Sequence, residues 1–373
     1  MMQSSIIPLE KPEAGGHGRF AAAYEVLNGA IAAHAFPGCA FGVLRNGQVI
    51  LEDALGHFTY ESDAPAVLAD TVFDVASLTK VVATTAAAML LFQRGLLDLD
   101  MPLGELLPGF VVGRTPGERA RLVTQRHLLA HSSGLPGYVE FYRTISTPSA
   151  LYRALLELTL ESEPGAQTEY SDPGFILLGK ALEVLTGEYL APWTTREVFA
   201  PLKMSATGFC PAVATRAAIP PTEEDTALRR RRIQGEVQDE HAWLLKGAAG
   251  HAGLFSNVPD LLRFADEILQ AGENGRLFAR ETVDLFAQRQ GPQGSSRALG
   301  WDTPSENSSS GHHFSSRSIG HLGYSGCSLW IDLEAGIAVV LLTNRTWPNR
   351  STTSKELIRR VRPAFHDNLF QAL

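Results

Sequence analysis

Strand-like segments lie near both ends of this 373-residue chain, and a long region with helical patterns separates them. Phe41–Leu44 and Val49–Leu51 are apolar stretches joined across Asn46-Gly47, a pair that supplies the positive φ angles of a tight hairpin. Gly326–Asp332 and Ile337–Thr343 form a second expected strand pair near the C-terminus. Terminal strands that bracket a helical insertion favour one antiparallel sheet built from both chain ends, which is an α+β architecture.

Helical patterns flank and separate these strand pairs. Residues Arg19–Ala35 and Thr353–Leu369 predict helices at the two chain ends. Residues Ser77–Arg94 are rich in Ala, Leu and Met and predict a helix that Gly95 closes. From about Leu96 to Gln290 the chain shows no strand-like alternation of any length. The clearest helices of this range are 151–160, 175–185 and 261–269.

These patterns predict a division of the chain into two regions. We expect residues 1–76 and 295–373 to build the sheet region from both chain ends, and residues 77–294 to form a mainly helical region. We expect the two regions to form one unit, with terminal helices flanking the sheet.

The charge of the chain restricts its partners. A formal net charge of −8 argues against nucleic acid, because such binding requires Lys and Arg to neutralise phosphates. The run Arg229–Arg232 is a local exception, but acidic residues surround it at Glu223–Asp225 and Glu236. We interpret the run as a self-neutralised surface segment rather than a basic docking patch.

Three further features concern location and cross-links. The N-terminal residues 1–18 lack the basic start and apolar core of a secretory signal, and the apolar runs are too short to cross a bilayer. We therefore expect no integral membrane segment and a cytoplasmic protein, or a periplasmic or secreted one if a leader has been removed. The cysteines at 39, 210 and 327 lie far apart, and they predict neither a zinc site nor a disulfide framework.

The first chemical signal is Ser77-Leu78-Thr79-Lys80. Positions three apart on a helix share a face, so the Ser77 hydroxyl and the Lys80 amine can point into the same cleft. A serine hydroxyl is a weak nucleophile until a neighbouring group removes its proton or stabilises the alkoxide. The pattern is short, and by itself it equally describes a helix N-cap serine followed by a solvated lysine.

Two later segments change that reading. Tyr170-Ser171-Asp172 stands directly before a predicted helix, and Gly320-His321-Leu322-Gly323 enters a strand. Together with Ser77-Leu78-Thr79-Lys80, they resemble in order and spacing the S-x-x-K, Y-x-N and K-T-G motifs of penicillin-binding proteins and class C β-lactamases. The resemblance extends from about Phe41 to about Pro348 and includes the segments 73–76, 128–136, 170–175, 250–256 and 342–345. It is strongest to the β-lactamase-related group that includes D-alanyl-D-alanine carboxypeptidase-like proteins and esterases.

The resemblance implies a β-lactamase/transpeptidase-like fold and assigns catalytic roles. Ser77 would be the acyl-accepting nucleophile, Lys80 its proton partner, and Tyr170 the base for acylation and then the acid for the leaving group. The backbone N–H groups of Ser77 and Tyr324 would form the oxyanion hole, which stabilises a tetrahedral intermediate by about 3 kcal/mol for each donor.

The same resemblance places the substrate-binding residues Asp172, His321 and Gly323. His321 would lie on the strand at the edge of the cleft. A side chain at position 323 would obstruct a substrate lying along that strand, so glycine suits the position.

Two residues depart from the motifs of the family. His321 stands where lysine is usual. A histidine with an ordinary pKa of about 6.5 is mostly neutral at pH 7, so it binds a substrate carboxylate more weakly than a lysine would. Arg345 could supply the missing charge or be a surface arginine past a strand end. Asp172 replaces asparagine; its carboxylate accepts hydrogen bonds only, and near Lys80 it would favour the ammonium form. That favours Tyr170 over Lys80 as the base.

Other histidines and glycines do not predict a cofactor. His127 and His131 stand four apart, but no H-E-x-x-H pattern accompanies them, so we expect structural roles and no metal site. Gly250 and Gly253 are not arranged as G-x-G-x-x-G between a strand and a helix, which argues against a nucleotide site. We therefore expect no cofactor.

Three functions remain open. We favour a serine hydrolase that acts through an acyl-enzyme on small esters or amides. The second is a D-alanyl-D-alanine carboxypeptidase or β-lactamase with the same chemistry. The third is a non-catalytic penicillin-binding or sensor module, which the presence of Ser77, Lys80 and Tyr170 together disfavours. The expected partner is a small ester, amide or peptide-like substrate, and the oligomeric state is left open.

Overall fold

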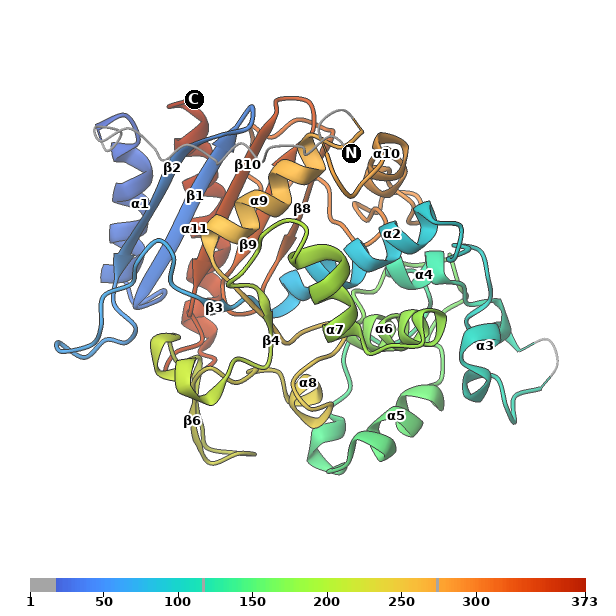
Figure 1. The fold of residues 1–373 in the computed structure, drawn as a ribbon. Coiled ribbons are helices and arrows are strands. Elements are labelled where there is room, and N and C mark those ends of the chain that lie inside the picture. The colour runs from blue at the N-terminus through green and yellow to red at the C-terminus, as the bar shows by residue number, and fades with distance from the viewer. Residues whose placement is uncertain (1–17, 116–117, 273–274) are drawn as a thin grey trace.

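The structure is a computed structural model that describes residues 18–115, 118–272 and 275–373. Its main sheet is antiparallel and has five strands, which Figure 1 shows side by side. The strand order is β2 (Gln48–Gly56), β1 (Gly38–Arg45), β10 (Ile337–Thr343), β9 (Ser328–Asp332) and β8 (Ser318–Leu322). Because β1 pairs with β10, strands from opposite chain ends meet in the middle of the sheet. The predicted α+β fold is confirmed.

The N-terminal hairpin has the predicted turn. Asn46 and Gly47 have φ angles of +49° and +78°, as the turn of a two-residue hairpin requires. The hairpin register runs from Gly38 opposite Gly56 to Arg45 opposite Gln48. At the other end of the chain, β9 and β10 pair with Ile337 opposite Asp332, as expected for the second strand pair.

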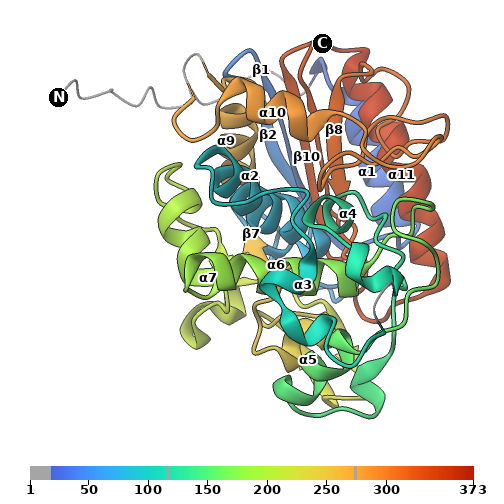
Figure 2. The ribbon, with the colours of Figure 1, turned by 90° about the vertical axis from the view of Figure 1, so that its right-hand side faces the viewer.

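Helices cover both faces of this sheet (Figures 1 and 2). On one face, the terminal helices α1 (Ala21–Ala32) and α11 (Thr352–Phe370) pack together over Val339 and Leu341. Val339 and Leu341 belong to β10. On the other face of the sheet, α9 (Val258–Leu269) and the inserted helical region pack over the residues of β10 that alternate with these two. Since successive strand residues point to opposite faces, an apolar strand such as β10 is buried on both sides.

The segment from Ala76 to Gln93 forms a central helix of the inserted region. It begins as a 3₁₀ turn at Ala76–Leu78, continues as a π-helix over Lys80–Thr85 and becomes the α-helix α2 only at Ala86–Gln93. By length and apolar composition this segment could span a membrane, which contradicts the expectation that every apolar run is too short. Inside the protein 78% of it is buried, so it is a core helix.

The inserted region also contains short strands that the sequence pattern did not predict. A three-stranded sheet has the order β3 (Phe73–Asp74), β7 (Leu254–Ser256) and β4 (Gly208–Phe209). A separate pair joins β5 (Glu223–Asp225) to β6 (Arg231–Ile233). Strands of two or three residues are too short to show an alternating pattern, so the pattern could not predict them.

The inserted region contains further helices (Figure 2). Their bounds are α3 (Leu103–Leu106), α4 (Gln125–Leu129), α5 (Pro148–Leu156), α6 (Asp172–Thr186), α7 (Leu190–Thr194), α8 (Glu240–Leu244) and α10 (Arg280–Ala287). A π-helical turn at Thr195–Phe199 continues α7. Of these helices, α6, α7 and α10 pack against the central helix. Among all the helices of the inserted region, α5, α6 and α9 correspond to the three clearest predicted helices.

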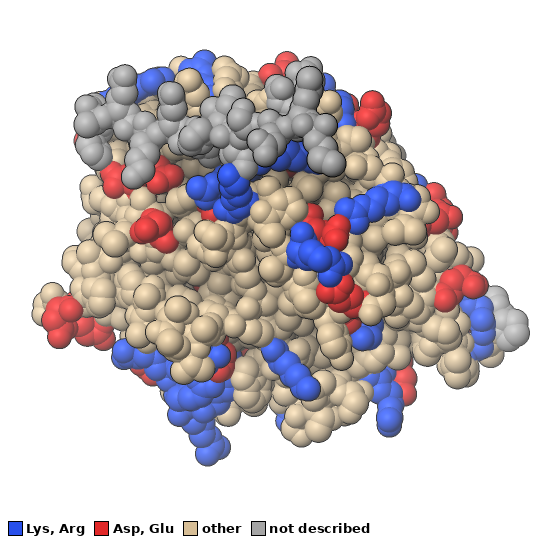
Figure 3. Space-filling view, viewed as in Figure 1, with Lys and Arg blue, Asp and Glu red and all other residues tan. Residues whose placement is uncertain are grey.

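Charged side chains of both signs are spread over the face in Figure 3. The arginine run lies at the β5–β6 hairpin, where Arg231 pairs with Glu236 at 2.7 Å and Arg232 with Glu224 at 2.8 Å. Arg229 is buried and pairs with Asp225 at 2.9 Å. These three arginines are neutralised by nearby acidic residues, and one of them belongs to the interior rather than to the surface.

Candidate active site

Ser77 lies in a constrained turn between β3 and the central helix. Ala76, directly before it, has a φ angle of +47°, which residues other than glycine rarely adopt. The buried Asp74 carboxylate holds this turn by accepting hydrogen bonds from the N–H of Ala76 at 2.9 Å and of Gln238 at 2.8 Å. Strained backbone that surrounding contacts hold in place is typical of functional sites.

Lys80 lies one turn after Ser77, and its side chain is fully buried. The Nζ atom is 3.1 Å from Ser77 Oγ, 2.7 Å from Asp172 Oδ1 and 3.1 Å from the backbone oxygen of His251. An ammonium group has three donors, and these three acceptors use them all. The pairing of Ser77 with Lys80 that the sequence predicted is therefore present, and Asp172 binds Lys80 directly.

Tyr170 and Asp172 enter the site from the start of α6. Ser171 is the N-cap of this helix and accepts a hydrogen bond from the N–H of Gly174 at 3.0 Å. This cap fixes the direction of its two neighbours. The centre of the Tyr170 ring lies 4.9 Å from Lys80 Nζ, while Asp172, the first residue of α6, binds the same ammonium.

Burial and charge act in opposite directions on the ionisation of this cluster. Burial alone would lower the pKa of Lys80, but the negative charge of Asp172, with a further contribution from Tyr170, outweighs it and raises that pKa. Burial raises the pKa of Tyr170, and Lys80 opposes this rise. At neutral pH the resting site therefore holds an ammonium at Lys80 and a phenol at Tyr170.

The third motif lies on β8, the edge strand of the main sheet. His321 is buried, and its Nδ1 donates to the backbone oxygen of Leu322 at 2.9 Å. Burial and the charge of Lys80 keep the pKa of His321 well below its usual value, so the ring is neutral. Its centre lies 5.9 Å from that of Tyr170, which makes His321 one wall of the site.

Gly323 brings β8 against the nucleophile turn. A Cβ atom added at Gly323 would lie 2.6 Å from the backbone oxygen of Val75, two residues before Ser77. Contact between two backbone segments is therefore one reason for glycine at this position. The expectation that a side chain would also obstruct the substrate stays a prediction. The approach continues at Ser325, whose Oγ donates to the Asp74 oxygen at 2.9 Å, so Tyr324 lies between two residues that contact the segment before Ser77.

The Ser77 N–H is not used by the helix that it begins. The first hydrogen bond of the 3₁₀ turn joins the N–H of Leu78 to the oxygen of Val75 at 3.1 Å, and the N–H of Ala76 bonds Asp74. The first N–H groups of any helix lack a partner within it. The Ser77 N–H is thus available to bind a developing oxyanion, as the sequence resemblance implies.

Arg345 is neither a surface residue nor part of an open cleft. Its side chain is buried, and the guanidinium carbon lies 4.5 Å from the centre of the Tyr324 ring. Its Nη1 also lies 3.4 Å from Ser354 Oγ, at the first turn of α11. Of the two alternatives for Arg345, the surface arginine is wrong, and its side chain packs against the Tyr324 ring.

Three groups that the sequence did not assign to the site lie at its border. The His131 ring stacks 4.6 Å from Tyr170, and its Nδ1 accepts a hydrogen bond from the Ser171 N–H at 3.0 Å. Arg297 places its guanidinium carbon 5.2 Å from the centre of the Tyr170 ring. His251 provides the carbonyl that binds Lys80. Each contact joins distant parts of the chain, although His131 and His251 lie in segments that resemble the family.

One cluster beside Lys80 consists of groups that can ligate metals, although the sequence predicted no metal site. Ligand atoms of Asp239, His241 and His251 lie within 4.8 Å of one another. A direct hydrogen bond of 2.7 Å between Asp239 Oδ1 and His251 Nε2 accounts for two of these groups. That bond holds the His251 loop, and thereby the carbonyl that accepts from Lys80.

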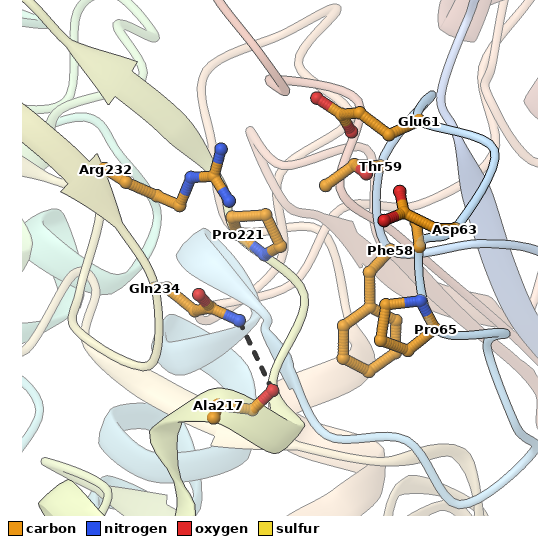
Figure 4. A pocket seen from close by; sticks show the side chains of 10 residues that line it. Phe58, Thr59, Glu61, Asp63, Pro65, Ala217, Pro221, Arg232 and Gln234 are labelled. Atoms are coloured by element: carbon orange, nitrogen blue, oxygen red, sulfur yellow. Dashed lines mark hydrogen bonds between the residues drawn. The ribbon is translucent and has the colours of Figure 1, made fainter.

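A separate cavity of about 300 Å³ lies beside the β5–β6 hairpin (Figure 4). Phe58, Asp63, Pro221 and Arg232 are among the residues that line it. Its lining includes none of the residues that the sequence placed in the catalytic site. Ser77 and its partners therefore form a site distinct from this cavity.

The fold and this arrangement define a class of protein. A serine at the start of a buried helix, a lysine one turn later, a tyrosine before a second helix and a sheet edge beside them are the features of β-lactamase and penicillin-binding folds. Residues 23–361 match the family model for Beta-lactamase, and the chain belongs to this family. It is an enzyme of the serine hydrolase type that these folds represent.

Similar proteins differ in their named activities. The chain is 32% identical to an N-acetylmuramyl-L-alanine amidase of Bacillus subtilis, over 83% of this chain and 77% of the relative. It is 27% identical to a protein of Salmonella typhi provisionally named D-alanyl-D-alanine carboxypeptidase, over 83% and 79%. Among solved structures, EstCE1, a hydrolase with promiscuous acyltransferase activity, has a TM-score of 0.72 at 25% identity, with 94% and 100% of the chains covered.

Proposed function

We propose that this protein hydrolyses small esters or amides through an acyl-enzyme formed on Ser77. The observation that carries the proposal is the contact of 3.1 Å between Ser77 Oγ and Lys80 Nζ, with the Tyr170 ring 4.9 Å from the same ammonium. These side chains come from two helices, and only the folded chain brings them together. A nucleophile, a charged partner and a second proton-transfer group are the minimum set for acyl transfer.

Tyr170 serves as the base in this proposal. Because Lys80 is held as an ammonium by Asp172, it does not accept a proton, but its charge stabilises a tyrosinate. Once Tyr170 has released its proton to solvent, its oxygen takes the proton of Ser77 as Oγ attacks the carbonyl carbon. Tyr170 then gives this proton to the departing oxygen or nitrogen, which leaves the acyl group on Ser77. In the second half, water attacks the acyl carbon as Tyr170 takes a proton from it, and Tyr170 returns that proton to Ser77 Oγ as the acid departs.

The backbone supports the same chemistry. The N–H groups of Ser77 and Tyr324 would stabilise the oxyanion of both tetrahedral intermediates. Gly323 makes this possible by letting β8 approach the Ser77 turn. Fixed backbone donors need little reorganisation during the reaction, which is their advantage over mobile side chains.

The finer choice of substrate favours an amide or ester over a β-lactam. His321 is neutral where the family motif has a lysine, and the most similar relative described above is named as an amidase. A D-alanyl-D-alanine carboxypeptidase is the second candidate, because the Salmonella relative carries that name. Both use the same acyl-enzyme, so the leaving group decides between them.

Mass spectrometry of the intact protein tests the proposal. We expect a fluorophosphonate to add one label at Ser77, and a p-nitrophenyl ester to give a transient acyl adduct at the same residue. Ser77→Ala should carry neither. Wild-type protein that remains unlabelled by both reagents would favour a non-catalytic binding module. Rapid and stable labelling by a penicillin, with slow ester turnover, would favour the carboxypeptidase.

A further inference from the structure

Arg297 places a positive charge beside the proposed acid–base residue. It lies between α10 and β8, in a part of the chain that the sequence motifs do not include. Its guanidinium carbon is 5.2 Å from the centre of the Tyr170 ring. Burial is the main cause that lowers the pKa of His131 and of His321, and the charge of Arg297 adds to it at both.

The guanidinium has weak pairing with the protein. Its nearest carboxylate is Asp302, whose Oδ1 lies 4.0 Å from Arg297 Nε. That oxygen already accepts hydrogen bonds from Ser296 Oγ at 2.6 Å and from the Thr303 N–H at 3.1 Å. Within the described ranges, the five N–H donors of Arg297 have no hydrogen-bond acceptor in the protein, and the side chain is 20% exposed. Such a group is available to a ligand.

The backbone around Arg297 is well anchored. The Arg297 oxygen accepts from the Gln290 N–H at 2.9 Å, and the N–H of Ala298 donates to Trp301 at 2.9 Å. Two residues before Arg297, Ser295 Oγ accepts a hydrogen bond from Thr168 Oγ1 at 2.9 Å. Thr168 lies two residues before Tyr170 in the sequence. A binding group on an anchored segment loses less freedom when a ligand arrives.

We propose that Arg297 binds a carboxylate on the leaving-group side of the substrate. This rests on the proposed function, in which Tyr170 donates its proton to the leaving group, so that a cation next to Tyr170 lies next to that group. The planar guanidinium suits a carboxylate, which it can bind through two parallel hydrogen bonds. Arg297 would thereby replace, from another part of the chain, the cation that position 321 lacks. An amino acid or peptide released from an amide would carry such a carboxylate.

An alternative role for Arg297 predicts a different result. If its guanidinium only positions the Tyr170 ring through a cation–π contact, its loss should slow all substrates equally. If it binds a carboxylate, its loss should slow only substrates that carry one. A pair of esters with the same acyl group separates the two roles.

The experiment compares phenyl acetate with 3-acetoxybenzoate. Both transfer an acetyl group to Ser77, and only the second has a carboxylate on its leaving group. For Arg297→Gln we expect kcat/KM for 3-acetoxybenzoate to fall about ten- to a hundredfold, the range for a hydrogen bond to a charged group. We expect phenyl acetate to change less than about threefold, and Arg297→Lys to recover part of the loss. Arg317→Gln, which removes an exposed arginine paired with Asp284, is the matched control.

The results overturn the proposal in two ways. An equal loss on both esters assigns Arg297 to positioning Tyr170, and no loss on either ester removes it from the site. Wild-type protein that turns over neither ester contradicts the proposed function instead. In that case calorimetric binding of 3-hydroxybenzoate still tests Arg297, because Arg297→Gln should weaken it about tenfold or more. Equal binding by wild type and Arg297→Gln would refute the carboxylate site.

Discussion

Lys80 Nζ lies 2.7 Å from Asp172 Oδ1, and this buried pair joins the central helix to the start of α6. The carboxylate stands where the family motif has an asparagine, so the site contains one negative charge more than the motif implies. Because that charge favours the ammonium form of Lys80, it supports our proposal that Tyr170 is the base.

Removal of the Ser77 hydroxyl should abolish ester hydrolysis and preserve the fold. Ser77→Ala deletes the atom that forms the acyl bond, while Lys80 keeps its bonds to Asp172 and to the His251 carbonyl. The free energy of unfolding should fall by about 1 kcal/mol at most. Steady-state turnover and a denaturant titration measure the two effects. Residual turnover within about tenfold of wild type would remove Ser77 from the nucleophilic role.

Replacement of Tyr170 by phenylalanine should lower kcat at least about 100-fold, the lower end of a general-base contribution. Binding of an unreactive substrate analogue should change little, because the aromatic ring remains. A strong loss of affinity with normal kcat would instead make Tyr170 a binding residue.

The pH profile gives a second measure of Tyr170. Burial raises the pKa of this phenol, and the base form requires its deprotonation, so kcat/KM should increase from neutral to alkaline pH. Tyr170→Phe should lose this rise, since the titrating group is gone. A wild-type profile that is highest at acidic pH would contradict the assignment of Tyr170 as the base.

Replacement of Asp172 by asparagine should change how Lys80 titrates. The carboxylate raises the pKa of Lys80 against the effect of burial, so Asp172→Asn leaves burial to lower it. The alkaline decline of kcat/KM, where Lys80 loses its charge, should therefore move to lower pH. The pH–rate profile of a neutral ester measures this change. An alkaline limb identical to that of wild type would show that Asp172 does not control Lys80.

Addition of a methyl group at Gly323 should separate β8 from the Ser77 turn. The new Cβ would lie 2.6 Å from the Val75 oxygen, so one backbone segment must move. Displacement of the Tyr324 N–H from the oxyanion position should lower kcat about 100-fold, and overpacking should cost about 1–3 kcal/mol of stability. Gly208→Ala is the control, because a Cβ there meets no atom within 4 Å. Normal kcat for Gly323→Ala would exclude this route to the oxyanion hole.

Much of the fold could be predicted because its signals are local. The turn at Asn46-Gly47, the helical spacing in α1 and α11, and the apolar strands β9 and β10 each depend on a few neighbouring residues. The spacing of Ser77 and Lys80 likewise sets their contact within one helix. The short strands β4 to β7 were missed because two or three residues carry no period.

The sequence by itself determined the strand pairs at both ends, the motif order and the chemistry that Ser77, Lys80 and Tyr170 can perform. Only the tertiary structure decided that Asp172 contacts Lys80, that Gly323 meets the Val75 carbonyl, and that Arg297 stacks on Tyr170. Helix and turn signals depend on side chains a few positions apart, whereas these three contacts join residues separated by 92, 248 and 127 positions in the numbering. Such contacts exist only because the packing of helices against one sheet brings distant segments together.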